Sequence, residues 1–132
     1  MGKKLIRAGV FETNSSSTHS ITISNDTVLN DTITPDSEGV VRLSGGEFGW
    51  DYFDSNEAIV KANYAAQALG DDCENLIEVI REQTGAEFVL IDTSKGYIDH
   101  QSVGLVNEDK EWLRQFIFSK GSYLYGGNDN DW

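Results

Sequence analysis

Short runs that alternate polar and apolar side chains fill the first fifty residues, and this is the pattern of strands with one buried face. The clearest runs are residues 20–24 and 39–43, with weaker candidates at 28–29 and 32–34. Residues 47–50 add an aromatic run after the turn residues Ser44-Gly45-Gly46. Turns at this spacing predict strands joined as hairpins.

Two helices are predicted next, because apolar residues then repeat at helical spacing. For the first, Asp54 is the expected N-cap with Glu57 three residues later, and Gly70 is the expected end. For the second, Asp71 and Glu74 repeat the start signal and Gly85 ends the pattern. The core-facing stripes are Ile59, Ala62, Ala66 and Leu69 in the first helix, and Cys73, Leu76, Ile77 and Ile80 in the second.

The last third of the chain predicts further strands and one more helix. The continuous apolar run at 88–91 is typical of a buried central strand, and residues 96–98 and 123–125 are short strand candidates. Asn107 is the expected cap of a helix that ends near Gly121, with Trp112, Leu113, Phe116 and Ile117 facing the core. This order predicts a single α+β domain over residues 1–132, with a mixed, mostly antiparallel sheet packed against about three helices and a loose tail at 126–132.

Charge is the strongest global feature of this chain of 132 residues. Twenty-two acidic and ten basic residues give a formal net charge of −12, and residues 51–100 hold eleven of the acids against three bases. Such a surface repels nucleic acid, because phosphate binding needs Lys and Arg, but it attracts a basic protein groove. The alternative is that the charge serves solubility alone. The predicted partner-binding residues are Asp51, Asp54, Glu57, Asp71, Asp72, Glu74, Glu78 and Glu82.

Three of these acids are expected to form one uninterrupted negative row. Glu74, Glu78 and Glu82 recur every four residues, so they share one surface of the second helix, while Arg81 falls off that line. Like charges at this spacing repel, and removing them is expected to leave folding intact or to stabilise it.

The segment around Asn14, Ser15, Ser16, Ser17, Thr18 and His19 is the most unusual stretch. Its short hydroxyl and amide side chains and free backbone N–H groups suit a phosphate or another anion. A Ser or Thr beside a His also suits a nucleophile with its base. The alternative is a surface turn that satisfies its own hydrogen bonds.

The two histidines of the chain, His19 and His100, raise a second catalytic alternative. His100-Gln101-Ser102 matches half of a two-histidine phosphodiesterase pattern, whereas His19-Ser20-Ile21 does not match the other half. A site of this kind would need His19 within reach of His100 or Ser102. No cofactor and no metal site is predicted, because Cys73 stands alone and no ligand spacing of a known type occurs.

The opening of the chain resembles that of a family of small proteins from phages, prophages and bacteria. The resemblance is carried by residues 9–21, Gly-Val-Phe-Glu-Thr-Asn-Ser-Ser-Ser-Thr-His-Ser-Ile, with looser echoes at 46–50, 61–64, 98–102, 116–118, 122–123 and 128–130. It implies a phage or mobile-element accessory protein. Small acidic proteins of that setting often inhibit host defence, including anti-CRISPR and anti-restriction proteins, and many occupy a nucleic-acid groove.

Two hypotheses of function result. The first is a non-enzymatic acidic inhibitor that binds the basic nucleic-acid-binding groove of a host defence factor. The second is an enzyme or sequestering protein for a phosphate-bearing nucleotide, using the Ser-rich segment and the two histidines. No apolar run approaches a membrane span and no signal peptide is evident, so a cytoplasmic protein of a bacterial host is expected.

Overall fold

Three helices and seven strands make up the part of the chain that the structure describes. The structure is a computed structural model, and it describes residues 17–25, 28–48, 53–98 and 105–128. The predicted α+β class and the single domain are confirmed. The elements are β1 (Ser17–Thr22), β2 (Val40–Leu43), β3 (Glu47–Phe48), β4 (Phe53–Ser55), α1 (Ala58–Leu69), α2 (Glu74–Thr84), β5 (Phe88–Ile91), β6 (Tyr97–Ile98), α3 (Lys110–Phe118) and β7 (Tyr123–Asn128).

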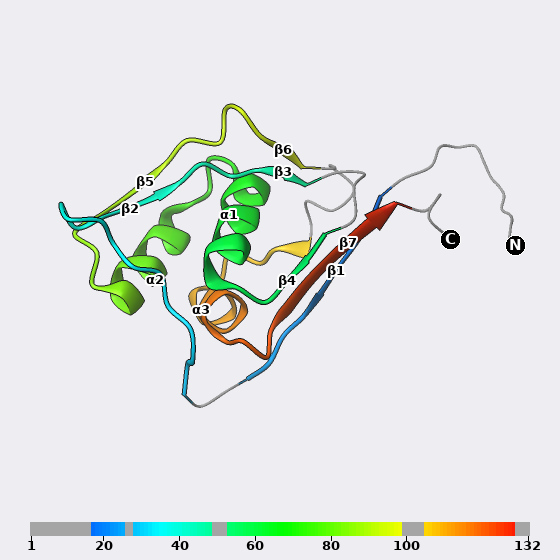
Figure 1. Cartoon of the computed structure of the whole chain (residues 1–132), viewed down its shortest axis with the longest axis horizontal. Helices are drawn as coiled ribbons and strands as arrows, with labels where there is room; N and C mark the ends of the chain where they lie inside the picture. The colour runs from blue at the N-terminus through cyan, green and yellow to red at the C-terminus, as the bar shows by residue number, and fades with distance from the viewer. Residues whose placement is uncertain (1–16, 26–27, 49–52, 99–104, 129–132) are drawn as a thin grey trace, which may run out of the picture.

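The strands are divided among three small sheets. β7 lies between β1 and β4, antiparallel to both, while β2 pairs with β5 and β3 pairs with β6 in parallel. The helices lie between the antiparallel sheet and the two parallel pairs (Figure 1). β7 runs to Asn128, so it takes in the first three residues of the predicted loose tail.

The predicted hairpin between 39–43 and 47–50 is wrong, because β2 and β3 each pair with a later strand. Side chains of α1 explain why the chain does not reverse there. The N–H of Gly45 donates to Oδ1 of Asn63 (3.1 Å), and the N–H of Gly46 donates to Oε1 of Gln67 (3.2 Å). Gly45 has a φ of 70°, and a side chain there would overlap Gln67. The segment after β2 is therefore held against α1, and β3 pairs with β6 instead of with β2.

The three predicted helices exist, but all three begin later than expected. Asp54 lies in β4, and the first N–H of α1, that of Ala58, donates to Oδ2 of Asp31 (2.9 Å). The N-cap position of α2 is Cys73, not Asp71, and no side chain caps it. For α3 the cap is Asp109, which accepts from the N–H of Trp112 (3.0 Å).

The helix ends follow the glycine signal at two places, and Asn107 has a role other than capping. Gly70 and Gly85 follow α1 and α2 with positive φ values of 60° and 75°, as a glycine ending requires. Asn107 accepts through Oδ1 from the N–H of Asp109 (2.8 Å), so it shapes the turn before α3. α3 ends at Phe118, three residues before Gly121.

The prediction of a buried central strand at 88–91 is wrong. Among the described strands β5 pairs only with β2, and along it only Val89 is buried while Phe88 and Leu90 are exposed. Leu90 is 50% exposed and Phe88 57%, whereas Val89 is 8% exposed and packs inward. Leu90 is therefore not part of the core, which lies around α1, α2 and α3.

Lys61 of α1 lies in the centre of the core with an exposed fraction of 0%. Its Nζ donates to the carbonyl oxygens of Ser119 (2.7 Å) and Ser122 (3.0 Å) and lies 6.0 Å from the centroid of the Phe116 ring. Burial lowers the pKa of Lys61 to about 8, and the negative charge of Asp31 opposes that shift. The ammonium group thus joins the end of α3 to the start of β7 at an electrostatic cost.

This geometry predicts a stability difference between wild type and Lys61→Met that depends on pH. Between about pH 8 and 10.5 the unfolded chain holds a proton on Lys61 that the folded chain has lost. The free energy of unfolding of the wild type should therefore rise relative to the variant across that window, by at most about 3 kcal/mol.

Urea unfolding of both proteins from pH 7 to 10.5 measures this difference. The raised pKa values of Cys73 and Tyr123 act on both proteins alike and cancel in the subtraction. Lys95→Met, at an exposed lysine, shows the effect of removing one positive charge from the surface. A wild-type minus Lys61→Met difference that stays constant with pH would contradict the assignment.

Candidate functional site

The acids predicted to form one partner-binding face fall into separate groups. Asp54 lies in β4 and Glu57 directly precedes α1, whereas Asp71, Asp72 and Glu74 lie where α1 gives way to α2. The twelve residues of α1, about 18 Å of helix, separate these two groups. Asp51 lies outside the described residues.

The expectation of an uninterrupted negative row on α2 is wrong, because α3 neutralises two of its three acids. Nζ of Lys110 lies 3.2 Å from Oε1 of Glu78 and 2.9 Å from Oε2 of Glu82. Nη2 of Arg114 lies 2.9 Å from Oε1 of Glu82. The hydrogen bonds that Lys110 and Arg114 donate to Glu82 lower the pKa of Glu82, and those that Lys110 donates to Glu82 and Glu78 raise the pKa of Lys110. These acids hold α2 against α3.

The structure therefore reverses the expected effect of removing them. Glu78→Gln combined with Glu82→Gln should lower the melting temperature, because Lys110 loses both of its ionic partners and Arg114 keeps only Glu111. Since the folded pKa of Glu82 is lowered, its stabilisation is present at neutral pH and is lost as the pH falls through that value.

Thermal melts at pH 7 and pH 3 in low salt provide the measurement. The difference from wild type should shrink at pH 3, and it should also shrink in high salt. Glu74→Gln is the matched control on the same helix, because Glu74 has no ion pair among the described residues. A double variant as stable as wild type at pH 7 would rule out this role.

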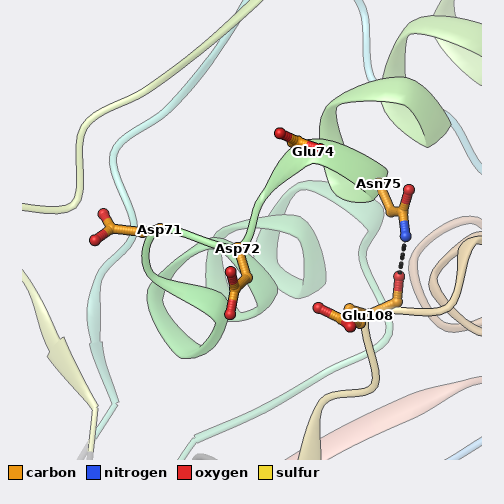
Figure 2. A pocket seen from close by; sticks show the side chains of 5 residues that line it. All are labelled: Asp71, Asp72, Glu74, Asn75 and Glu108. Atoms are coloured by element: carbon orange, nitrogen blue, oxygen red, sulfur yellow. Dashed lines mark hydrogen bonds between the residues drawn. The ribbon is translucent and has the colours of Figure 1, made fainter.

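Three of the other predicted acids, Asp71, Asp72 and Glu74, lie in a pocket at the junction of α1 and α2. We call it the junction pocket; it has a volume of about 260 Å³ and is lined by Asp71, Asp72, Glu74, Asn75 and Glu108 (Figure 2). After α1 ends at Gly70, the N–H of Asp72 donates to the carbonyl oxygen of Leu69 (3.0 Å) and the chain turns into α2. Nδ2 of Asn75 donates to the carbonyl oxygen of Glu108 (3.0 Å), which fixes the segment before α3 beside the turn.

The four carboxylates of the junction pocket have no cationic neighbour within the described ranges, since none of the ion pairs found there includes them. Two of these carboxylates, those of Asp71 and Asp72, act on the neighbouring Cys73. Burial is the main cause of the raised pKa of the Cys73 thiol, and the charges of Asp72 and Asp71 add to it. The pocket is thus a concentrated, unneutralised negative surface.

The arrangement of these carboxylates does not suit a metal ion. In Figure 2 the side chains of Asp72 and Glu108 extend into the same space, while those of Asp71 and Glu74 point away from it. No group of three or more His, Cys, Asp or Glu side chains in the described part of the chain is placed to hold a metal. The separate basic side chains on the surface of another protein can each pair with one of these carboxylates, even though the carboxylates point in different directions.

The Ser-rich segment is described only in part. Ser17, Thr18 and His19 belong to β1, whereas Asn14, Ser15, Ser16, His100 and Ser102 lie outside the described residues. His19 is 8% exposed, and its Nδ1 is hydrogen-bonded to the hydroxyl of Tyr64 at 2.8 Å. Its ring centroid lies 5.2 Å from that of Phe53 and 5.7 Å from that of Tyr64. The imidazole is part of the aromatic packing between β1, β4 and α1.

Two residues of the junction pocket were missed by the sequence reasoning. Glu108 lies 33 residues after Asn75, and the loop before α3 carries it to the pocket. The sequence marks Glu108 only as an acid just before a predicted helix, and acids are common at that position in any helix. Asn75 follows Glu74 on a predicted helix face, and nothing in its neighbours marks it as a link to another segment.

Comparisons with known proteins add no relative. No protein-family model matches this chain, and no match was found among curated proteins or among solved structures. The resemblance to the phage and prophage family therefore stays a prediction. Within the described ranges, no helix combines the length and the apolar character that a bilayer crossing requires.

Proposed function

We propose that this protein is a non-enzymatic binding protein whose junction pocket docks on a basic, nucleic-acid-binding groove of a host defence factor. The observation that carries the proposal is the concentration of four exposed carboxylates, those of Asp71, Asp72, Glu74 and Glu108, without a cationic neighbour among the described residues. The whole chain also carries a formal net charge of −12, so its overall charge has the same sign as the pocket.

Charge complementarity supports a protein partner rather than a nucleic acid. A groove that holds phosphates presents Lys and Arg in a row, and carboxylates replace phosphates as their partners. Asp71 and Asp72 stand on the turn between α1 and α2, both of which contact α3, so little backbone freedom is lost when they are bound. The long-range field speeds association with a basic surface.

The proposal uses three of the eight acids that the sequence predicts to bind a partner. Glu78 and Glu82 are occupied by Lys110 and Arg114, so they are poor candidates for a second ionic partner. Asp54 and Glu57 lie at the far end of α1 from the junction pocket. The proposed surface is therefore Asp71, Asp72 and Glu74 of the predicted set, together with Glu108.

The phage setting, and with it the anti-CRISPR or anti-restriction class, is the part of the proposal that rests on the resemblance of residues 9–21. An inhibitor of this kind works by occupying a site, so it needs no catalytic group. The placement of His19 in the aromatic packing is consistent with this, because that imidazole is committed to a structural hydrogen bond.

The test compares two triple variants that remove the same number of charges. One carries Asp71→Asn, Asp72→Asn and Glu108→Gln in the junction pocket, and the other carries Glu38→Gln, Glu47→Gln and Glu57→Gln at exposed acids elsewhere. A partner is first isolated from nuclease-treated host lysate and purified. Its association rate with each variant is then measured, together with its binding of labelled DNA or RNA.

The junction variant should associate at least tenfold more slowly than the control variant, because it loses the local charges and not only net charge. Wild-type protein should displace nucleic acid from the partner, and its association rate should fall steeply with salt. Equal rates for the two variants would exclude the junction pocket. A partner that binds nucleic acid equally well with and without the protein would refute groove blocking.

A further inference from the structure

No strand in the described part of the chain covers one of the two edges of β5. The N–H of Phe88 donates to the carbonyl oxygen of Gly39 (3.2 Å), and that of Asp92 donates to Leu43 (2.9 Å), so alternate residues of β5 turn their backbone groups toward β2. The N–H and C=O groups of Val89 and Ile91 therefore turn the other way. No group in the described part of the chain pairs with them, and β5 lies on the outer rim beyond β2 (Figure 1).

The same strand presents an apolar outer face. Phe88 is 57% exposed and Leu90 50%, while Val89 is 8% exposed and packs inward. Parallel strands are normally covered on both faces, and open edges normally carry charges or proline. The four residues of β5, Phe-Val-Leu-Ile, contain neither. An edge of this kind favours pairing with another strand.

We propose that β5 is a homodimer interface, at which it pairs antiparallel with β5 of a second copy about a two-fold axis at Val89. In this register the backbone groups of Val89 exchange two hydrogen bonds with those of Val89 of the second copy. Phe88 of each copy then lies opposite Leu90 of the other on the outer face. The product is a four-stranded sheet in the order β2, β5, β5, β2.

A second copy fits this edge for three reasons. The register is self-complementary, because the two residues next to Val89, Phe88 and Leu90, are both large and apolar. No charge within the strand is desolvated by the approach of its own copy. The two-fold arrangement also uses the open edge of both copies, so assembly stops at a dimer.

The expected dimer is weak. Phe88 and Leu90 together offer roughly 200 Å² of apolar surface per copy, since a fully buried aromatic side chain covers about 150–250 Å². The whole contact falls below the ~1,200 Å² that stable complexes bury. Two copies of net charge −12 also repel each other. Added salt screens that repulsion, so it should strengthen the dimer, whereas it should weaken binding to a basic partner.

The first experiment measures the molar mass of the full chain by sedimentation from about 10 μM to 1 mM, in 50 and 500 mM NaCl. Wild type should shift from monomer to dimer with concentration, at lower concentration in the higher salt. Leu90→Lys should weaken association at least tenfold. The matched control is Val28→Lys, at a side chain 75% exposed outside β5, which adds the same charge and should not weaken association.

The second experiment tests the register. Residues opposite each other in a non-hydrogen-bonded pair have Cα atoms about 4.5 Å apart, within disulfide range. An oxidised equimolar mixture of Phe88→Cys and Leu90→Cys should therefore give a cross-linked dimer. Each variant alone places its cysteines diagonally, about 7–8 Å apart, and should cross-link far less. The buried Cys73 is common to all samples.

Three results of these two experiments would overturn the proposal. They are a wild type that stays monomeric at 1 mM in both salts, a Leu90→Lys variant that dimerises like wild type, and growth beyond dimers. Capture of a different protein's strand at β5 by a monomeric chain would also overturn it. Because the junction-pocket experiment uses another surface and the opposite salt response, either proposal can fail without the other.

Discussion

The buried ammonium group of Lys61 is the contact on which the arrangement of the helices and the antiparallel sheet depends. Its two carbonyl acceptors, Ser119 and Ser122, bracket the turn between α3 and β7, and β7 is the central strand of the antiparallel sheet. Asp31 also acts on α1. Its carboxylate accepts a hydrogen bond from the first N–H of the helix, and its negative charge raises the pKa of Lys61, which burial lowers. One charge in the interior thus fixes three segments that are far apart in the sequence.

The distribution of charge follows from which helix faces the packing covers. α3 brings Lys110 and Arg114 to α2, and there Glu78 and Glu82 are partnered. The turn between α1 and α2 has no basic residue, so Asp71, Asp72 and Glu74 form no ion pair within the described ranges, and Glu108 joins them in the pocket. The large negative net charge is therefore partly structural, and the four carboxylates of the junction pocket are among those left for a partner. Solubility alone would not require four carboxylates without an ion pair to gather around one pocket.

Local signals allowed the sequence to predict the elements but not their partners. Helical spacing identified α1, α2 and α3, and glycines marked two of their ends, because both effects depend on nearby residues. The start of α1 was misplaced, since its cap is Asp31, 27 residues upstream of Ala58. The apolar run 88–91 suggested a central strand because composition does not show whether a second neighbour exists. The junction pocket was found only in part, since Glu108 reaches it through the packing of α3.

The open edge and the acidic pocket lie at opposite ends of α2, and this separation has a consequence for binding. α2 is about 16 Å long, the junction pocket precedes it, and β5 follows it after a short turn. Pairing through β5 would leave both junction pockets uncovered, so a dimer would carry two acidic surfaces on one rigid sheet. A partner with two basic grooves, or one long groove, would then be held by both, and the second contact would form at a high effective concentration. A weak contact between copies is sufficient for this effect, because a partner that binds both copies also holds them together.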